Sequence, residues 1–307
     1  MDEVIRTENL KKYFGKVKAV DGISIHIGRG EIYGFLGLNG AGKTTTIRLL
    51  LGMMRPTSGS AYLNGIRVNA GQTQLWNRVG YLVEIPYSYP DLTVVENLEM
   101  FRRLRLIPDK EVVERVMDHL KLIPYKDRLA KNLSLGNSQR LGLAKAIMHH
   151  PEILILDEPA NGLDPAGLVE IRELLHNLAL NQGVTILVSS HLLGEVSKFA
   201  TRIGIIHDGK MIQETKTDEL IRYVKRRLLV KVRDRKGASD LLKNNGYVTG
   251  DKDSEVLEVA GNNALDHPEQ INQLLVNAGY LLSMIRVEEE DLESYFLRVI
   301  GKSGGEA

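Results

Sequence analysis

Gly37-Leu38-Asn39-Gly40-Ala41-Gly42-Lys43-Thr44 is the most informative segment of this chain. It fits the pattern Gly-x-x-x-x-Gly-Lys-Ser/Thr, whose glycines let successive backbone N–H groups point toward one centre. Such donors at the start of a helix bind phosphate groups. We expect Lys43 to reach the β- and γ-phosphates of a nucleotide, and the Thr44 hydroxyl to bind magnesium. The alternative is a glycine-rich turn that precedes a surface lysine.

The segments on either side of this loop support the phosphate-binding interpretation. Residues 32–36 predict a strand that enters the loop, and residues 45–51 predict a helix that leaves it. Continuous apolar runs at 153–156 and 185–188 predict further strands that are covered on both faces. Helical patterns fall at 94–105, 110–122, 138–149 and 168–180. This alternation predicts an α/β domain with a largely parallel sheet over residues 1–224.

Acidic residues follow the predicted strand at 153–156. Asp157 suits a magnesium anchor, and Glu158 suits a base that accepts a proton from attacking water. His191 follows the next predicted strand, and ligands of open α/β sheets bind beyond the carboxyl ends of the strands. We therefore expect the His191 imidazole to hydrogen-bond the γ-phosphate. The alternative is a loop histidine that faces solvent.

The composition excludes several kinds of site and partner. The chain has 307 residues, of which 43% are apolar and 26% are charged, as in ordinary globular proteins. Its 40 basic and 39 acidic residues leave a net charge of +1, which gives no reason to expect nucleic acid as a partner. The absence of cysteine rules out disulfides and cysteine metal sites. No signal peptide and no membrane-spanning run are visible, so we expect any role at a membrane to depend on a partner.

A second, smaller domain is expected over residues 225–307. Strand patterns with partial period-two alternation fall at 228–233 and at 255–259, and another strand candidate falls at 281–287. Helical patterns lie between and after them. One face of a final helix carries the apolar side chains of Leu292, Tyr295, Phe296, Val299 and Ile300. These patterns predict a small α+β accessory domain.

Together the motifs resemble those of the ATP-binding-cassette (ABC) ATPase family, over residues 3–222. Tyr13 matches the aromatic residue that stacks on adenine. Ser134 and Gly136 match the signature motif, which binds the γ-phosphate of the ATP held by the opposite subunit. Asp164 matches the loop that crosses the dimer interface. The resemblance implies a P-loop NTPase fold with a RecA-like core, an antiparallel β subdomain and a helical subdomain, followed by the α+β domain.

The resemblance also implies a complete set of site residues. The expected catalytic residues are Lys43, Glu158 and His191. The expected metal ligands are Thr44, Glu84 and Asp157. The expected nucleotide-binding residues are Tyr13, Gly37, Leu38, Asn39, Gly40, Ala41, Gly42, Lys43, Thr44, Thr45, Ser134, Gly136 and Asp164.

Three positions depart from the usual family pattern. The signature is normally Leu-Ser-Gly-Gly-Gln, and here Leu135 and Asn137 replace a glycine and the glutamine. Glu84 stands where most members have a glutamine that touches magnesium and water. A glutamate keeps an oxygen ligand and adds a negative charge, so we expect a stronger contact with the metal. The alternative is that the substitution has no functional effect, because the position tolerates change. Glu84, Leu135 and the helix at 292–296 are similar to the branch that serves bacitracin and lantibiotic export or immunity.

The resemblance implies an ATPase, with ATP and Mg²⁺ as cofactors, that drives an ABC-2-type exporter of a peptide antibiotic or another amphiphile. Because the chain has one phosphate loop and one signature motif, we expect two copies to sandwich the nucleotides. The groove near Glu84 and residues 85–98 is expected to receive a cytoplasmic helix of a separate membrane permease. This arrangement places the chain at the cytoplasmic side of the cell membrane.

Three other functions remain to be compared with the exporter interpretation. A soluble ABC ATPase that acts on nucleic acid or the ribosome usually shows two cassettes, long insertions or basic segments. A regulatory nucleotide-binding module would use residues 225–307 to sense a ligand, whereas packing and dimer support are the simpler roles for that domain. A phosphate-loop kinase would transfer phosphate to an acceptor, which the acidic pair and the histidine fit less well than they fit water.

Overall fold

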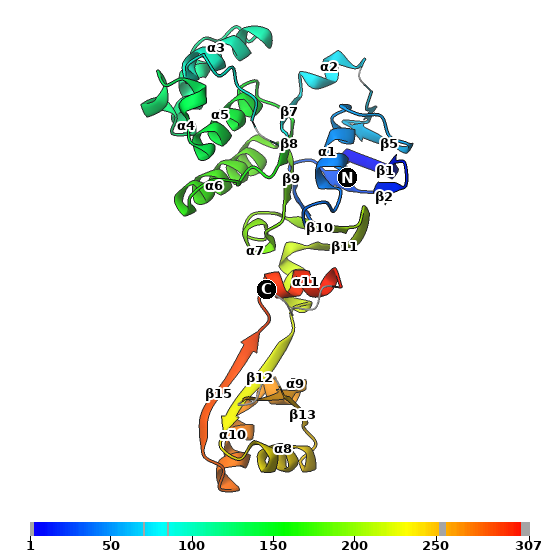
Figure 1. Cartoon of the computed structure of the whole chain (residues 1–307), viewed down its shortest axis with the longest axis vertical. Helices are drawn as coiled ribbons and strands as arrows, with labels where there is room; N and C mark the ends of the chain where they lie inside the picture. The colour runs from blue at the N-terminus through cyan, green and yellow to red at the C-terminus, as the bar shows by residue number, and fades with distance from the viewer. Residues whose placement is uncertain (1–2, 70, 85, 252–255, 302–307) are drawn as a thin grey trace. The chain divides into compact units, whose positions relative to one another are not determined.

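The computed structural model describes residues 3–69, 71–84, 86–251 and 256–301 (Figure 1). Contacts between residues divide the chain into two compact units, Met1–Asp218 and Glu219–Ala307. The sequence predicts a domain boundary between residues 224 and 225, six positions after the division between these units. That boundary stays a prediction. Each unit has its own sheet system and its own hydrophobic core.

The first unit is built around a six-stranded sheet in the order β11-β10-β4-β9-β8-β7. The five strands from β10 to β7 are parallel, and β11 pairs antiparallel with β10 at one edge. The bounds are β4 (Ile32–Leu36), β7 (Val79–Leu82), β8 (Ile153–Asp157), β9 (Thr185–Ser190), β10 (Arg202–His207) and β11 (Lys210–Lys216). Every residue of β4, β8 and β9 is buried, which confirms the strands predicted from continuous apolar runs.

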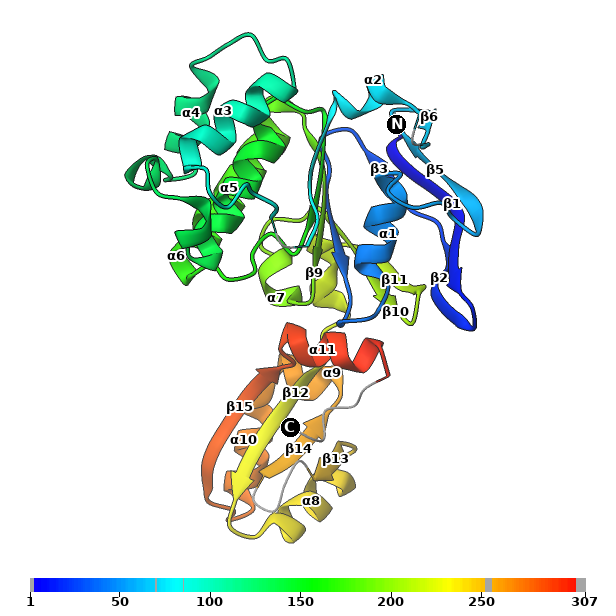
Figure 2. The same cartoon turned by 45° about the horizontal axis from the view of Figure 1, so that its top comes forward.

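An antiparallel sheet forms the second layer of this unit. Its strands are β1 (Glu3–Phe14), β2 (Val17–Ile23), β3 (His26–Gly28), β5 (Ser58–Leu63) and β6 (Ile66–Arg67). The predicted helix after the phosphate loop is α1 (Lys43–Leu50), which lies beside β9 in Figure 2 and contacts β2, β5 and β8. Apolar residues of α1 and of both sheets share one core. The first helix therefore packs against strands of both sheets.

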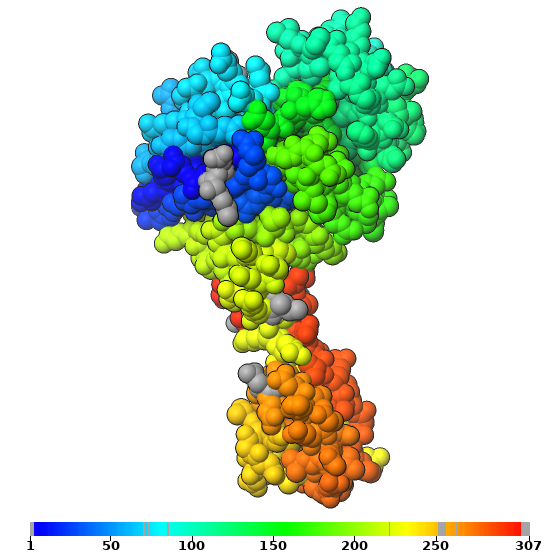
Figure 3. Space-filling model, turned by 180° about the vertical axis from the view of Figure 1, so that it is seen from behind, coloured from blue at the N-terminus to red at the C-terminus, as the bar shows by residue number. Residues whose placement is uncertain are grey.

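A helical group extends from β7 and leads back to β8. It contains α3 (Val94–Leu104), α4 (Val112–His119) and α5 (Leu135–Ile147), which contact one another. Thr93 and Glu96 form a reciprocal capping box that starts α3. Figure 3 shows the teal residues of α3 and α4 on the opposite side of this unit from the light-blue residues around β5 and α2 (Thr73–Trp76). The remaining elements of the unit are α6 (Pro165–Gln182), α7 (Leu193–Val196) and the 3₁₀ segments Ile123–Tyr125 and Ala130–Asn132. A further 3₁₀ segment, Thr217–Arg222, spans the boundary between the two units.

The second unit has a β-α-β-β-α-α-β-α order with a fully antiparallel sheet, β13-β14-β12-β15. Its elements are β12 (Arg226–Val232), α8 (Arg235–Asn244), β13 (Val248–Asp251), β14 (Val256–Ala260), α9 (Asn262–Asp266), α10 (Pro268–Asn277), β15 (Leu282–Glu289) and α11 (Leu292–Val299). The α+β prediction is confirmed, although residue 255 of the predicted middle strand lies outside the described residues. The predicted alternation in β12 was wrong, because Leu228, Leu229 and Val230 are all buried.

The parallel order of β4, β9, β8 and β7 positions the candidate site. Parallel strands bring their carboxyl ends to one edge of a sheet. Residues 37–42 follow β4, His191 follows β9, and Glu158 follows β8. Glu84 comes two residues after the end of β7. Segments that are far apart in the sequence therefore meet at one edge.

Candidate active site

The phosphate loop connects β4 directly to α1. Leu38, Asn39 and Ala41 shape it through a turn in which the Ala41 N–H donates to the Leu38 carbonyl at 3.1 Å, while Asn39 and Gly40 face solvent. Gly42 has a φ of 108°, and a Cβ atom there would lie 2.3 Å from the Ala19 carbonyl oxygen. Only glycine fits this position, so the loop can bring its N–H groups together ahead of α1.

Lys43 is the first residue of α1, and its side chain is only 6% exposed. Its ammonium donates to the carbonyl oxygens of Gly37 at 2.7 Å and Leu38 at 3.3 Å. The same nitrogen lies 3.1 Å from Oε1 of Glu158. The predicted phosphate-binding lysine and the predicted base are therefore in direct contact. Thr45, which follows on α1, is partly buried.

Asp157 ends β8 and is only 2% exposed. Its Oδ2 accepts a hydrogen bond from the Thr44 hydroxyl at 2.7 Å, which joins the two predicted metal ligands. Its Oδ1 accepts a hydrogen bond from the Ser189 hydroxyl at 2.5 Å. Both carboxylate oxygens thus have a hydroxyl partner, and the group is held in a fixed orientation.

Glu158 follows Asp157 with a φ of 49°, in the left-handed region that side chains usually avoid. Its backbone N–H lies 3.0 Å from the Ser189 hydroxyl oxygen, and its carbonyl accepts from the Gln139 side chain at 3.0 Å. Its Oε2 lies 2.9 Å from Nδ1 of His191, which is partly exposed. The structure therefore brings Lys43, Glu158 and His191 together in one cluster.

The signature segment starts α5. Ser134 is the N-cap of this helix, and its hydroxyl accepts from the Asn137 N–H at 3.3 Å. A Cβ atom on Gly136 would lie 2.9 Å from the Gly162 carbonyl oxygen, so this glycine allows two backbones to approach closely. Leu135, one of the departures from the family pattern, is 55% exposed. Asp164 caps α6 through the Gly167 N–H at 2.9 Å.

Tyr13 lies on the antiparallel sheet, near the end of β1. Its hydroxyl donates to Asp21 at 2.5 Å, and the Lys18 ammonium lies 5.6 Å from the ring centre. The hydrogen bond raises the pKa of the Tyr13 hydroxyl above its ordinary value and lowers the pKa of Asp21. The expected adenine contact of Tyr13, and the nucleotide contacts of Ser134, Gly136 and Asp164, stay predictions.

Glu84 makes an ion pair that the sequence did not reveal. The Arg48 guanidinium donates to its Oε1 at 2.6 Å. Arg48 lies in the last turn of α1, four residues after Thr44, so the pair connects Glu84 to the phosphate-loop helix. The expected metal contact of Glu84 stays a prediction.

A hollow of about 440 Å³ opens beside this ion pair. Its lining includes Arg48, Tyr81, Glu84, Tyr87, Tyr89 and Phe101. Lys145 also lines it and donates to the Tyr87 carbonyl, and burial lowers the pKa of this lysine to about 8. The hollow overlaps part of the groove predicted near residues 85–98, because Pro86, Tyr87, Tyr89 and Asn97 line it. Residue 85 lies outside the described residues.

Two contributors to the cluster had no signal in the sequence. Ser189 reaches both Asp157 and Glu158, and Gln139 reaches the Glu158 carbonyl. Both side chains are buried, at 0% and 3% exposure. A serine inside an apolar strand and a glutamine inside a helix belong to no recognisable motif. Ser189 reaches the acidic pair because β9 pairs with β8, and Gln139 reaches the Glu158 carbonyl because of the position of α5.

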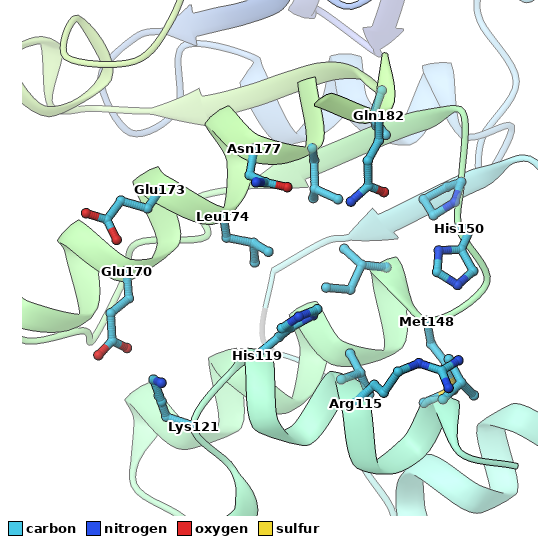
Figure 4. A pocket seen from close by; sticks show the side chains of 16 residues that line it. Arg115, His119, Lys121, Met148, His150, Glu170, Glu173, Leu174, Asn177 and Gln182 are labelled. Atoms are coloured by element: carbon cyan, nitrogen blue, oxygen red, sulfur yellow. The ribbon is translucent and has the colours of Figure 1, made fainter. Parts of the chain in front are cut away.

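Another hollow, of about 370 Å³, lies between α4 and α6 (Figure 4). Arg115 and His119 approach it from α4, and Glu170, Glu173 and Asn177 approach it from α6. Its lining includes none of the residues expected in the nucleotide site. This hollow is therefore formed by residues other than those of the candidate nucleotide site.

Comparisons with known proteins agree on one family. The ABC transporter family model matches residues 20–161. The bacitracin transport ATP-binding protein BcrA of Bacillus licheniformis is 39% identical over 304 residues, covering 98% of each chain. The lantibiotic transport ATP-binding protein SrtF of Streptococcus pyogenes is 34% identical over 220 residues, covering 70% of this chain and 92% of its own.

The solved structures give the same result for the fold. The dimeric structure of MJ0796, a bacterial ABC transporter cassette, is 26% identical with a TM-score of 0.64, and the match covers 69% of this chain and 98% of that one. The match confirms the fold class predicted from the motifs. In the described part of the chain, no helix combines the length and the apolar character that a membrane span requires.

Proposed function

This chain belongs to the ABC transporter family as an ATP-binding subunit that hydrolyses ATP, and we propose that it energises the export of a peptide antibiotic or another amphiphile. One observation carries the assignment of the catalytic site: Lys43, Asp157, Glu158 and His191 meet at the carboxyl edge of one parallel sheet. The similarity to bacitracin and lantibiotic transport proteins supports the exporter part of the proposal.

The contacts of Lys43 and Glu158 suggest how the reaction proceeds. A triphosphate that enters the loop takes the Lys43 ammonium from the carbonyl groups of Gly37 and Leu38, because phosphate oxygens carry more negative charge. The Glu158 carboxylate is then free to accept a proton from water in line with the γ-phosphate, a role typically worth about 10²–10⁴ in rate. His191, which lies 2.9 Å from the Glu158 carboxylate, would contact the same phosphate in this proposal.

Magnesium fits the oxygen atoms that Thr44 and Asp157 present. The two groups are 2.7 Å apart, and Mg²⁺ is typically held by one or two protein oxygens together with substrate phosphates and water. We infer that Thr44 and Asp157 bind the metal, with Glu84 as a further oxygen donor from the end of β7. Bound Mg²⁺ supplies charge neutralisation for the phosphates.

A second copy of the chain completes each site in this proposal. Ser134 and Gly136 lie at the start of α5, where the positive end of the helix dipole suits a phosphate oxygen of a facing chain. Because a symmetric pair places each signature segment opposite the partner's phosphate loop, two nucleotides hold the copies together. Hydrolysis removes that attraction and lets the copies separate.

The partner that receives this motion is, in our proposal, a separate ABC-2-type membrane permease. The hollow beside Glu84 combines exposed aromatic side chains with Arg48 and Lys145, which suits an amphipathic helix with an acidic residue. The ion pair between Arg48 and Glu84 connects this hollow to α1 and therefore to the phosphate loop. Docking there would hold the chain at the cytoplasmic side of the cell membrane.

The test of this function uses the variant Glu158→Gln in the full-length chain. We expect ATP hydrolysis to fall by at least about 100-fold, because the base is lost, while ATP binding remains. In the presence of MgATP the variant should run as a stable dimer by light scattering. Glu152→Gln, which changes the glutamate just before β8, serves as the matched control and should behave as wild type. A monomeric, fully active Glu158→Gln chain would contradict the proposal.

A further inference from the structure

Ser189 contacts both acidic residues of the candidate site through one hydroxyl group. Its Oγ donates to Oδ1 of Asp157 at 2.5 Å and accepts from the backbone N–H of Glu158 at 3.0 Å. A serine hydroxyl has a single proton, so one donated and one accepted hydrogen bond are mutually consistent. The side chain is 0% exposed, and water cannot easily replace either contact.

The Glu158 backbone is held by hydrogen bonds at both its N–H group and its carbonyl group. The N–H lies near the Ser189 hydroxyl and, at 3.3 Å, the Ser189 carbonyl, while the Glu158 carbonyl accepts from Gln139 and from the Asn161 N–H. This residue has a φ of 49°, a conformation that persists only where surrounding contacts enforce it. The contacts with Ser189 are therefore part of what keeps the Glu158 side chain directed toward Lys43 and His191.

We propose that Ser189 is a positioning residue for ATP hydrolysis, which orients the Asp157 carboxylate and the Glu158 backbone together. One hydroxyl thereby fixes the direction of the metal anchor relative to the direction of the base. The inference rests on the proposed function, because it assumes that Asp157 binds Mg²⁺ and that Glu158 activates water. It assigns Ser189 no contact with nucleotide, metal or the reacting atoms.

The neighbouring residue Ser190 provides a matched control. Successive side chains of a strand point to opposite faces, so the Ser190 hydroxyl lies away from the acidic pair and accepts from the Leu192 N–H at 3.1 Å. Ser190 is also buried, at 6% exposure. Replacing either serine by alanine removes one hydroxyl from the same strand, but only the Ser189 hydroxyl is hydrogen-bonded to Asp157 and Glu158.

The experiment measures Mg²⁺ dependence in the full-length variants Ser189→Ala, Ser189→Thr and Ser190→Ala. Binding of a fluorescent, non-hydrolysable ATP analogue is titrated with Mg²⁺, and kcat and KM for ATP are measured separately. For Ser189→Ala we expect the Mg²⁺ requirement to rise about 10-fold to 100-fold, as for other lost partners of metal ligands, with a fall in kcat at a nearly constant KM. Ser189→Thr retains the hydroxyl and should recover most of the loss.

The outcomes separate this inference from the proposed function. If Ser189→Ala and Ser190→Ala show the same Mg²⁺ dependence and the same kcat, Ser189 does not position the acidic pair. If Ser189→Ala does not fold, Ser189→Cys, which fills a similar volume with a weak donor, is held to the same expectation. If the wild-type chain itself binds the analogue without any dependence on Mg²⁺, the proposed magnesium site fails instead.

Discussion

Lys43 shows how one buried charge can hold a catalytic cluster together before substrate binds. Its ammonium is satisfied by two carbonyl oxygens and by the Glu158 carboxylate, all within 3.3 Å. Burial of this ammonium group is tolerated because two carbonyl oxygens accept hydrogen bonds from it and a carboxylate of opposite charge lies beside it. A triphosphate presents acceptors of the same kind, so the residue that organises the loop is also suited to binding nucleotide.

The variant Lys43→Ala tests this interpretation. We expect ATP affinity to fall at least about tenfold, which corresponds to about 1.4 kcal/mol, because charge-assisted contacts to phosphate are lost. Fluorescence titration with a labelled ATP analogue measures the change. Lys198→Ala, which removes an exposed lysine paired with Glu195, is the control and should bind ATP as wild type does. Undiminished affinity in Lys43→Ala would rule out the phosphate-binding assignment.

Among the helices, α3 depends on a network of charges around one glutamate. Glu99 accepts two hydrogen bonds from Arg102 at 2.8 Å and one from Arg103 at 2.8 Å. These hydrogen bonds lower the pKa of Glu99 to about 2. Arg102 is almost fully buried and also donates to the Ile107 carbonyl, so the network connects the end of α3 to the following loop.

This network predicts a pH dependence of stability with a definite sign. Because the pKa of Glu99 is lower in the folded state than its ordinary value of 4.5, its contribution is complete above pH 4.5 and is lost as the pH falls toward 2. Glu99→Gln should lower the free energy of unfolding by about 1 kcal/mol at pH 7, with a smaller difference at pH 3. Thermal melts at both pH values measure this, with the exposed Glu111→Gln as control. A difference that grows toward pH 3 would be contrary to the assignment.

The sequence predicted those elements whose burial follows from their own residues. Strand β8 reads Ile-Leu-Ile-Leu-Asp and is buried at every position, so its apolar run was sufficient. Strand β1 mixes charged and apolar residues over Glu3–Phe14, and its burial depends on three partner strands, so no residue range was predicted for it. The phosphate loop could be predicted because its residues are consecutive in the sequence. The roles of Ser189, Gln139 and Arg48 could not be predicted in this way. They arise from contacts between residues that are 19 to 36 positions apart in the sequence.

For the chain as a whole, the proposed pairing of two copies predicts that two inactive variants recover activity when they are mixed. Ser134→Arg should block the signature segment while leaving ATP binding to the isolated chain intact, and Lys43→Ala should disable the phosphate loop. A mixed pair of these chains contains one intact composite site. Equimolar mixing should therefore restore ATP hydrolysis to about a quarter of the wild-type rate, since half of the pairs are mixed and each has one working site.

The measurement is phosphate release from each variant alone and from the mixture at equal total protein concentration. Mixing Ser134→Arg with Glu152→Gln, which carries an intact phosphate loop and an intact signature, gives the upper reference. If the mixture of Ser134→Arg and Lys43→Ala stays as inactive as its components, the sites are not shared between copies.

The contacts of Lys43 also have a kinetic consequence. A lysine side chain that is free in solution loses about 2 kcal/mol of rotamer entropy when a ligand fixes it. Here folding has already fixed the side chain against Gly37, Leu38 and Glu158, so an arriving phosphate exchanges one set of acceptors for another. Nucleotide association should therefore occur in a single rapid phase, without a slow rearrangement of the loop after the first encounter.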